Sequence, residues 1–287
     1  MEIDKNEKCI VPNGLLVIVG GHEDKSGQRE KRKQEASSAK DVLATFFQLI
    51  GKKEPVLEVI TSGSSMGEES FKDYEKAFYA LGAKQVGHIH HDQRADVLQA
   101  DLGERLSKAD AVYFSGGDQL KLTSVYGGTE LLLILKERYI SDRLILGGTS
   151  AGAMAFSTPM IFAGGHEVQQ IAGEIRITTG LEFLKDVCID THFVDRGRFV
   201  RMAQVIATNP NSIGIGIEEN TAIIVRNGRE AEVIGKGVVI VIEGFHITSS
   251  NILKFGSQEC ISIHNLNVNL LSNGDKYQIP QHNPPHI

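Results

Sequence analysis

Residues 143–156 read RLILGGTSAGAMAF, and this stretch decides what fold the rest of the chain must build. The apolar run at 144–146 is typical of a buried strand in a parallel sheet. The sequence GTSAG that follows fits the G-x-S-x-G pattern of a nucleophile elbow, a tight turn that exposes a serine hydroxyl, here that of Ser150. The amide of Ala151 would then lie at a helix N-terminus, where it can face a developing oxyanion.

Strand and helix patterns alternate on the N-terminal side of this turn. Apolar runs at 15–19, 55–61, 85–89 and 111–114 indicate strands, and segments with helical spacing lie at 36–50, 71–81, 95–108 and 130–139. The alternation predicts an α/β fold with a mostly parallel sheet flanked by helices.

The C-terminal half continues with strand patterns at 187–190, 212–217, 222–226 and 233–243, a helix at 195–207, and an irregular segment at 159–180. Neither an internal repeat nor a Pro-rich or Ser-rich linker interrupts the chain. We therefore expect a single domain over 1–287, with a core of about 15–244 and a C-terminal extension of strands at 245–287.

The composition excludes several classes of protein. A formal net charge of -6 argues against nucleic-acid binding, and no apolar run is long enough to span a membrane. The polar N-terminus does not resemble a secretory signal. The cysteines Cys9, Cys188 and Cys260 are widely spaced and odd in number, which favours reduced thiols in a cytoplasmic protein.

A metal site is one reading of His88, His90 and His91, since His88 and His90 would share one face of a strand. No other ligands follow at a recognisable spacing, and polar residues at a strand end are the simpler explanation. We therefore expect neither a metal nor a cofactor.

A reactive serine needs a base and a group that orients the base. His192 follows the strand at 187–190, and the carboxylates Glu218 and Glu219 follow the strand at 212–217. Successive strand residues point to opposite faces, so only one carboxylate can reach His192, and spacing does not choose between them.

A second glycine pair follows the strand at 111–114. The amide of Gly117 is the natural second donor to an oxyanion, and the side-chain amide of Gln119 could reach the same pocket. The alternative is a helix-start turn capped by Asp118, and both readings can hold together.

Four motifs, GGTSAGA at 147–153, GGDQ at 116–119, DTHFVDRGR at 190–198 and GIGIEENTA at 214–222, together resemble the cyanophycinase family of serine peptidases, relatives of the aspartyl dipeptidases. The resemblance runs from about 15 to about 244. It implies a fold like that of the class I glutamine amidotransferases and a homodimer. It also implies hydrolysis of cyanophycin, a poly-aspartate with arginine on each β-carboxyl, to β-Asp-Arg dipeptides.

The resemblance also implies roles for individual residues. Ser150 matches the nucleophile, His192 the base and Glu219 the third member of the triad, with Glu218 as the fallback. Positions that line the substrate pocket in the family are matched by Gln119, Asp190, Arg196, Arg198 and Arg201. Two departures are Thr191, where we expect Gln, and His22, where we expect a small residue.

Such a substrate presents both a carboxylate and a guanidinium. Arginine binds carboxylates bidentately, and we expect one or two of Arg196, Arg198 and Arg201 to do so. Glu167, Glu174 and Asp190 are candidates for the guanidinium. An aspartyl or isoaspartyl dipeptidase with the same triad is the alternative function, and a non-catalytic binding protein is a second. A glutamine amidotransferase would need cysteine at position 150.

Overall fold

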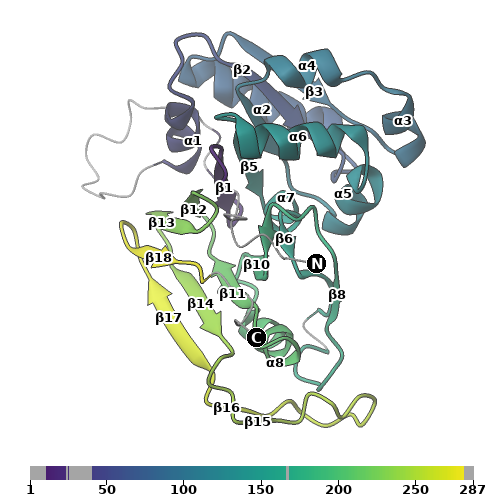
Figure 1. Ribbon diagram of the computed structural model, residues 1–287, viewed down its shortest axis with the longest axis vertical. Coiled ribbons are helices and arrows are strands. Elements are labelled where there is room, and N and C mark those ends of the chain that lie inside the picture. The colour runs from purple at the N-terminus through teal and green to yellow at the C-terminus, as the bar shows by residue number, and fades with distance from the viewer. Residues whose placement is uncertain (1–10, 24, 26–40, 166–167, 281–287) are drawn as a thin grey trace, which may run out of the picture.

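The computed structural model describes residues 11–23, 25, 41–165 and 168–280 (Figure 1). Cys9, the first part of the helix expected at 36–50, and Glu167 lie outside these ranges. Within them, no helix is long and apolar enough to cross a membrane.

The predicted parallel sheet is confirmed. Five parallel strands lie in the order β1 (Leu15–Val19), β5 (Ile145–Thr149), β4 (Ala111–Phe114), β2 (Val56–Ile60) and β3 (Gln85–Ile89). On the far side of β1 the sheet continues with three antiparallel strands, β12 (Thr221–Arg226), β13 (Glu230–Gly235) and β18 (Lys276–Gln278). The strand that carries the serine turn, β5, therefore lies between two other parallel strands, buried along its length.

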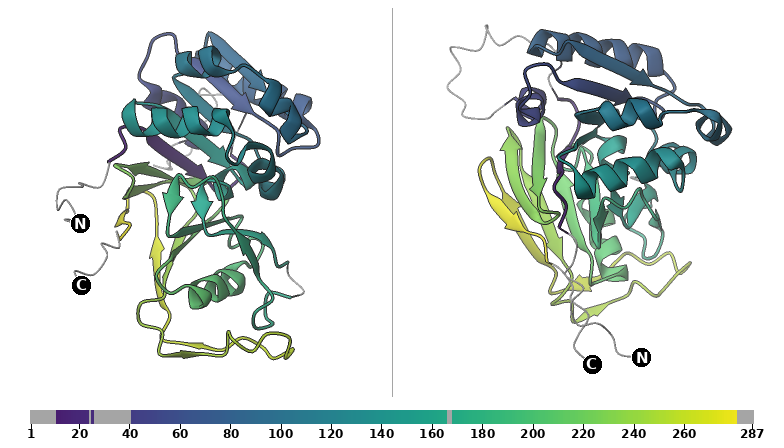
Figure 2. Two further views of the ribbon diagram at one scale, coloured as in Figure 1. Left: turned by 45° about the vertical axis from the view of Figure 1, so that its right-hand side comes forward. Right: turned by 45° about the horizontal axis from the view of Figure 1, so that its top comes forward.

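A second sheet is built from the C-terminal half of the chain. Its order is β17 (Asn267–Leu271), β14 (Val239–Glu243), β11 (Ile213–Ile217), β10 (Val187–Thr191), β6 (Ser157–Thr158) and β9 (Leu184–Lys185). Of these, β10 and β11 run parallel, so their carboxyl ends lie at the same edge of the sheet. Helix α8 (Phe199–Thr208) packs on this sheet. Figure 2 shows that the second sheet and α8 lie away from the helices of the N-terminal half.

The helices of the N-terminal half cover both faces of the first sheet. On one face, α1 (Val42–Ile50) and α2 (Gly67–Leu81) pack against Val17, Val19 and Tyr113. Toward the other face lie α3 (Arg94–Gln99), α4 (Gly103–Lys108), α5 (Gln119–Tyr126) and α6 (Glu130–Ser141). Alternate strand residues point to opposite faces of the sheet. Leu16 and Ile18 of β1 therefore belong to a second hydrophobic cluster, on the face covered by α3 to α6.

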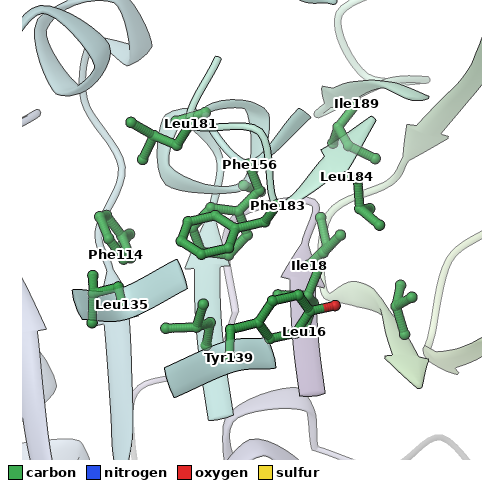
Figure 3. Close-up of a cluster of buried hydrophobic side chains, with 14 of the residues drawn as sticks. Leu16, Ile18, Phe114, Leu135, Tyr139, Phe156, Leu181, Phe183, Leu184 and Ile189 are labelled. Atoms are coloured by element: carbon green, nitrogen blue, oxygen red, sulfur yellow. The ribbon is translucent and has the colours of Figure 1, made fainter. Parts of the chain in front are cut away.

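That second cluster also joins the two sheets, since it includes Ile189 of β10 and Ile215 of β11. At its centre, the ring of Phe156 meets those of Phe114 and Phe183 edge to face, each at 5.2 Å between centroids (Figure 3). Phe156 follows α7 (Ala151–Met154), the short helix after the serine turn. Aromatic packing therefore fixes the end of the segment that carries Ser150.

Three expectations for the secondary structure were wrong in part. The helix expected at 95–108 is two helices, α3 and α4, because the backbone at Ala100 is extended. The segment at 159–180 contains the antiparallel pair β7 (Met160–Ala163) and β8 (Arg176–Thr178). The helix expected from Asp195 begins only at Phe199, because a turn with Gly197 at φ +57° precedes it.

The remaining short strands, β15 (Ser249–Ser250) and β16 (Ile263–His264), pair with each other in the segment between β14 and β17. Figures 1 and 2 place this pair at the end of the molecule far from β2 and β3.

Candidate active site

Ser150 occupies the sharp turn between β5 and α7, with φ +51° and ψ −117°. Its amide donates to Val19 O of β1 at 3.1 Å, and its carbonyl accepts from Met154 N at 3.0 Å. A Cβ on Gly152 would lie 2.5 Å from Phe114 O, so only glycine lets α7 approach β4 this closely. The neighbouring elements thus hold the strained serine backbone in place.

His192 lies directly after β10 and brings the second sheet to Ser150. Its amide donates to Gly20 O at 2.9 Å, and Nε2 of its ring lies 3.0 Å from Ser150 Oγ. The ring passes so close to Gly21 that a Cβ there would lie 2.3 Å from Cε1. The site therefore forms where the loop after β1 meets the ends of β5 and β10.

Glu219 is the hydrogen-bond partner of this imidazole. Nδ1 of His192 donates to Glu219 Oε1 at 2.6 Å, which leaves the Nε2 lone pair facing Ser150. Burial lowers the pKa of His192, although the hydrogen bond to Glu219 acts in the opposite direction. Partial burial acts to raise the pKa of Glu219, but the His192 hydrogen bond and the charge of His22 outweigh it and lower that pKa.

The neighbouring carboxylate has a different set of partners. Glu218 Oε2 accepts from the amides of Val194 and Asp195 at 2.5 and 3.3 Å, and Oε1 accepts from Glu219 N at 2.8 Å. These contacts tie the turn after His192 to the end of β11. The two acidic residues therefore point to different partners, as strand alternation requires.

Two backbone amides are available at the serine. Within the described part of the chain, neither Gly117 N nor Ala151 N donates to any acceptor. Gly117 has φ +137°, and a Cβ there would lie 2.1 Å from Gly63 O. Gly116 packs against Ser150, where a Cβ would lie 3.4 Å from the serine Cβ. Both amides thus lie in the immediate surroundings of Ser150, where they can stabilise an oxyanion.

The pocket over Ser150 has a volume of about 470 Å³ and is lined by His192, Gly117, Glu23 and Arg196, among others. Arg196 lies on the turn after His192, exposed, and has no ion pair with any described residue. It is the only one of the three predicted arginines in this lining.

Asp190, Arg198 and Arg201 form a buried ion cluster and are absent from the pocket lining. Arg201 makes a bidentate contact to the fully buried Asp190, with Nε 2.5 Å from Oδ2 and Nη2 on Oδ1, and Arg198 Nη1 adds a contact at 3.0 Å. Because α8 begins at Phe199, Arg201 sits on the helix face turned toward β10.

Gln119 also lies outside the pocket lining. Its Nε2 donates to Ile161 O at 2.8 Å, which links the start of α5 to β7. Glu174, a candidate for guanidinium binding, is half-buried and likewise absent from this lining.

Glu23 is a buried carboxyl group in the pocket lining. It accepts hydrogen bonds from Tyr74 at 2.5 Å, Thr149 at 2.6 Å and Tyr113 at 3.4 Å, and no described lysine or arginine forms an ion pair with it. Burial raises the pKa of both tyrosines well above the usual value, so their hydroxyls remain donors. The sequence predicted that Glu23 lies at a strand end, but it did not predict the contacts of Glu23 with these three hydroxyl groups.

His22 contacts both Glu219 and the ring of His192. Its Nδ1 lies 2.8 Å from Glu219 Oε2, and its ring meets that of His192 edge to face at 5.2 Å. Among the described residues, His22, His192 and Glu219 are the one group with ligand atoms close enough to hold a metal ion. The histidines at 88, 90 and 91, for which the sequence allowed a metal site, do not form such a group.

Comparisons with known proteins identify relatives of the whole chain. The model of peptidase family S51 matches residues 26–233. The cyanophycinase of Thermosynechococcus vestitus is 33% identical over 273 residues, which cover 95% of this chain and 81% of that protein. The cyanophycinase of Nostoc sp. is 30% identical over 266 residues, which cover 93% and 86%.

Among solved structures, a peptidase from an acI-B1 Actinobacterium superposes with a TM-score of 0.66 at 21% identity, covering 94% of this chain and 98% of that one. This similarity concerns the fold.

Proposed function

Because the chain belongs to peptidase family S51, we propose that it is a serine-type exopeptidase that hydrolyses cyanophycin to β-Asp-Arg dipeptides. The observation that carries this proposal is the continuous relay from Ser150 Oγ through His192 to Glu219, at 3.0 and 2.6 Å. The relatives of about 30% identity that span nearly the whole chain are named cyanophycinases, which supports the choice of substrate.

The chemistry follows from the positions of these groups. Ser150 Oγ attacks the carbonyl carbon of a backbone amide while His192 Nε2 takes the serine proton. The amides of Gly117 and Ala151 stabilise the oxyanion, and loss of one such donor commonly costs about a hundredfold in rate. The imidazolium then gives its proton to the leaving amine. Water, deprotonated by His192, hydrolyses the acyl-enzyme.

The charges of the pocket fit a substrate that carries both a carboxylate and a guanidinium. Arg196 is exposed in the lining and unpaired by any described carboxylate, so we assign it to the substrate carboxylate. Glu23 lies in the same pocket, where, among the described residues, Lys25 lies over the Tyr74 ring but forms no ion pair with Glu23, and we assign Glu23 to the guanidinium side. Asp190, Arg198 and Arg201 instead hold the turn after His192 against β10.

We expect Arg196→Ala to lower kcat/KM on cyanophycin by at least about thirtyfold, because an unpaired substrate charge costs about 2–5 kcal/mol. The loss should be much smaller on an activated ester without either charge, since the relay does not involve Arg196. Steady-state kinetics on both substrates make the comparison. Equal losses on the two substrates would contradict a role in recognition.

Arg201→Ala is the matched variant. It leaves Asp190 buried with only Arg198 as a cation, so we expect the free energy of unfolding to fall by about 3 kcal/mol. Arg196→Ala should leave stability within about 0.5 kcal/mol of the wild type, since Arg196 is exposed. Urea titrations distinguish the two. If Arg201→Ala has unchanged stability but loses activity on cyanophycin alone, Arg201 binds the substrate and is not a structural residue.

The substrate itself is tested by parallel assays on cyanophycin, Asp-X dipeptides and isoaspartyl dipeptides, with Ser150→Ala as the blank. The proposal expects cyanophycin to be the preferred substrate by kcat/KM. Turnover of the dipeptides alone would replace it with the dipeptidase function. By the resemblance of the sequence we further propose a homodimer, which light scattering of the purified protein tests. From the spacing and odd number of the cysteines we propose a cytoplasmic protein.

A further inference from the structure

A second imidazole lies on the carboxylate that orients His192. His22 Nδ1 is 2.8 Å from Glu219 Oε2, while His192 Nδ1 is 2.6 Å from Oε1. The His22 side chain is 69% exposed and the His192 side chain 4%. Each carboxylate oxygen thus faces one ring nitrogen, and solvent reaches the group from the His22 side.

Acidic residues lie beside this group. Glu218 Oε1 accepts from the Glu219 amide at 2.8 Å and Glu218 Oε2 from the Asp195 amide at 3.3 Å, so these three acidic residues are neighbours. Arg196 is the one arginine in the pocket lining, and it makes no ion pair with these carboxylates within the described part of the chain. Two further acidic residues thus lie next to Glu219, in a pocket whose lining also carries Lys25 and Arg196.

We propose that Zn²⁺ binds to His22, His192 and Glu219 and thereby inhibits the enzyme reversibly. Two imidazoles and one carboxylate form a ligand set that zinc uses in sites with one open position. This is an inhibitory site and supplies nothing to the hydrolytic reaction itself.

The distances are compatible with such a site. One nitrogen of each imidazole and one carboxylate oxygen lie within 4.8 Å of one another. Zinc bonds of about 2.0–2.2 Å bring tetrahedral ligand atoms to about 3.3–3.6 Å apart. The 2.6 Å contact between His192 Nδ1 and Glu219 Oε1 must lengthen to this range, so the partly exposed Glu219 carboxylate has to turn away from the buried His192, and the exposed His22 side chain can follow it.

The inhibition follows from the tautomer of His192. In the metal-free site, Nδ1 carries the proton that bonds Glu219, and the Nε2 lone pair faces Ser150. If Nδ1 binds zinc, the single proton of the neutral ring must sit on Nε2 instead. Nε2 can then no longer accept the serine proton, so the base is lost while the serine remains in place.

Binding is measured without catalysis on Ser150→Ala, by calorimetry with Zn²⁺ and by the visible spectrum with Co²⁺. Adding His22→Gly should weaken zinc binding by at least about tenfold, since loss of even an outer-shell partner costs 10–100-fold. Glycine suits the φ of +50° at this position, so the variant should fold. His264→Ala, an exposed histidine of β16, is the matched control and should bind zinc as tightly as Ser150→Ala alone.

Inhibition is measured on enzyme with Ser150 intact, each variant relative to its own zinc-free rate. This arm rests on the proposed function, because it needs a measurable peptidase rate, whereas the binding arm does not. Zinc should inhibit the wild type and His264→Ala equally, His22→Gly at least about tenfold more weakly, and a chelator should restore the rate. Unchanged zinc affinity in His22→Gly, or zinc bound through His22 without inhibition, would overturn the proposal.

Discussion

Replacing Ser150 with alanine is expected to reduce kcat on cyanophycin by about 10⁶-fold. The change removes the attacking oxygen of the proposed nucleophile, and His192 then has no proton to accept. Among the described residues the hydroxyl contacts only His192, so the free energy of unfolding should change little. Kinetics and urea titration of the same preparation measure both quantities.

Ser107→Ala is a suitable control, because this exposed serine bonds only the carbonyl of Glu104 in α4. It should retain the wild-type rate. A serine-reactive phosphonate should label Ser150 in the wild type and leave the Ser150→Ala variant unlabelled. Hydrolysis at the wild-type rate by purified Ser150→Ala would disprove the assignment of the nucleophile.

Glu219→Gln is expected to lower kcat by about 10³–10⁴-fold. An amide can still bond His192, but it cannot stabilise the imidazolium, and it can hold the wrong tautomer; the equivalent change in a Ser-His-Asp triad costs about 10⁴. The 2.6 Å contact to His192 Nδ1 is the reason for choosing this residue. Single-turnover kinetics separate the chemical step from binding.

Glu218→Gln is the matched variant one residue away. Its carboxylate accepts three backbone amides and does not contact His192, so the loss should appear in stability and be at most about tenfold in kcat. A larger kcat loss in Glu218→Gln than in Glu219→Gln would reverse the assignment of the orienting carboxylate.

The parts of the site that follow from local patterns were predictable from the sequence. The turn at Ser150 combines a buried strand, glycines and a helix of small residues, all within 143–156. His192 could be found because it follows a buried strand, and the parallel strands β10 and β11 bring the residues that follow them, His192 and Glu219, to one edge of the second sheet. That this edge meets the end of β5 in the other sheet was not predictable. Periodicity likewise gave the parallel strands, since each is an apolar run of normal length.

Choices that depend on tertiary contacts could not be made from the sequence. Strand alternation showed that only one of Glu218 and Glu219 reaches His192, but not which, since that depends on where β11 ends. Arg201 and Arg196 differ because α8 begins at Phe199 and not at Asp195. The turn before that start contains Gly197 at φ +57°, which is a local feature, and it is held by hydrogen bonds from the amides of Val194 and Asp195 to Glu218, which are long-range.

The contacts of His22 and Glu23 were not predictable for the same reason. His22 reaches Glu219 across almost 200 positions of sequence, and Glu23 meets hydroxyls from α2, β4 and β5. No local pattern encodes such distant partners.

The most direct test of the account is mass spectrometry of the products after incubation with purified cyanophycin. We predict β-Asp-Arg dipeptides that accumulate with time in the wild type and are absent with Ser150→Ala. Products of another composition, free arginine from cleavage of the side-chain bond, or an intact polymer alongside rapid cleavage of Asp-X dipeptides would contradict the proposed function.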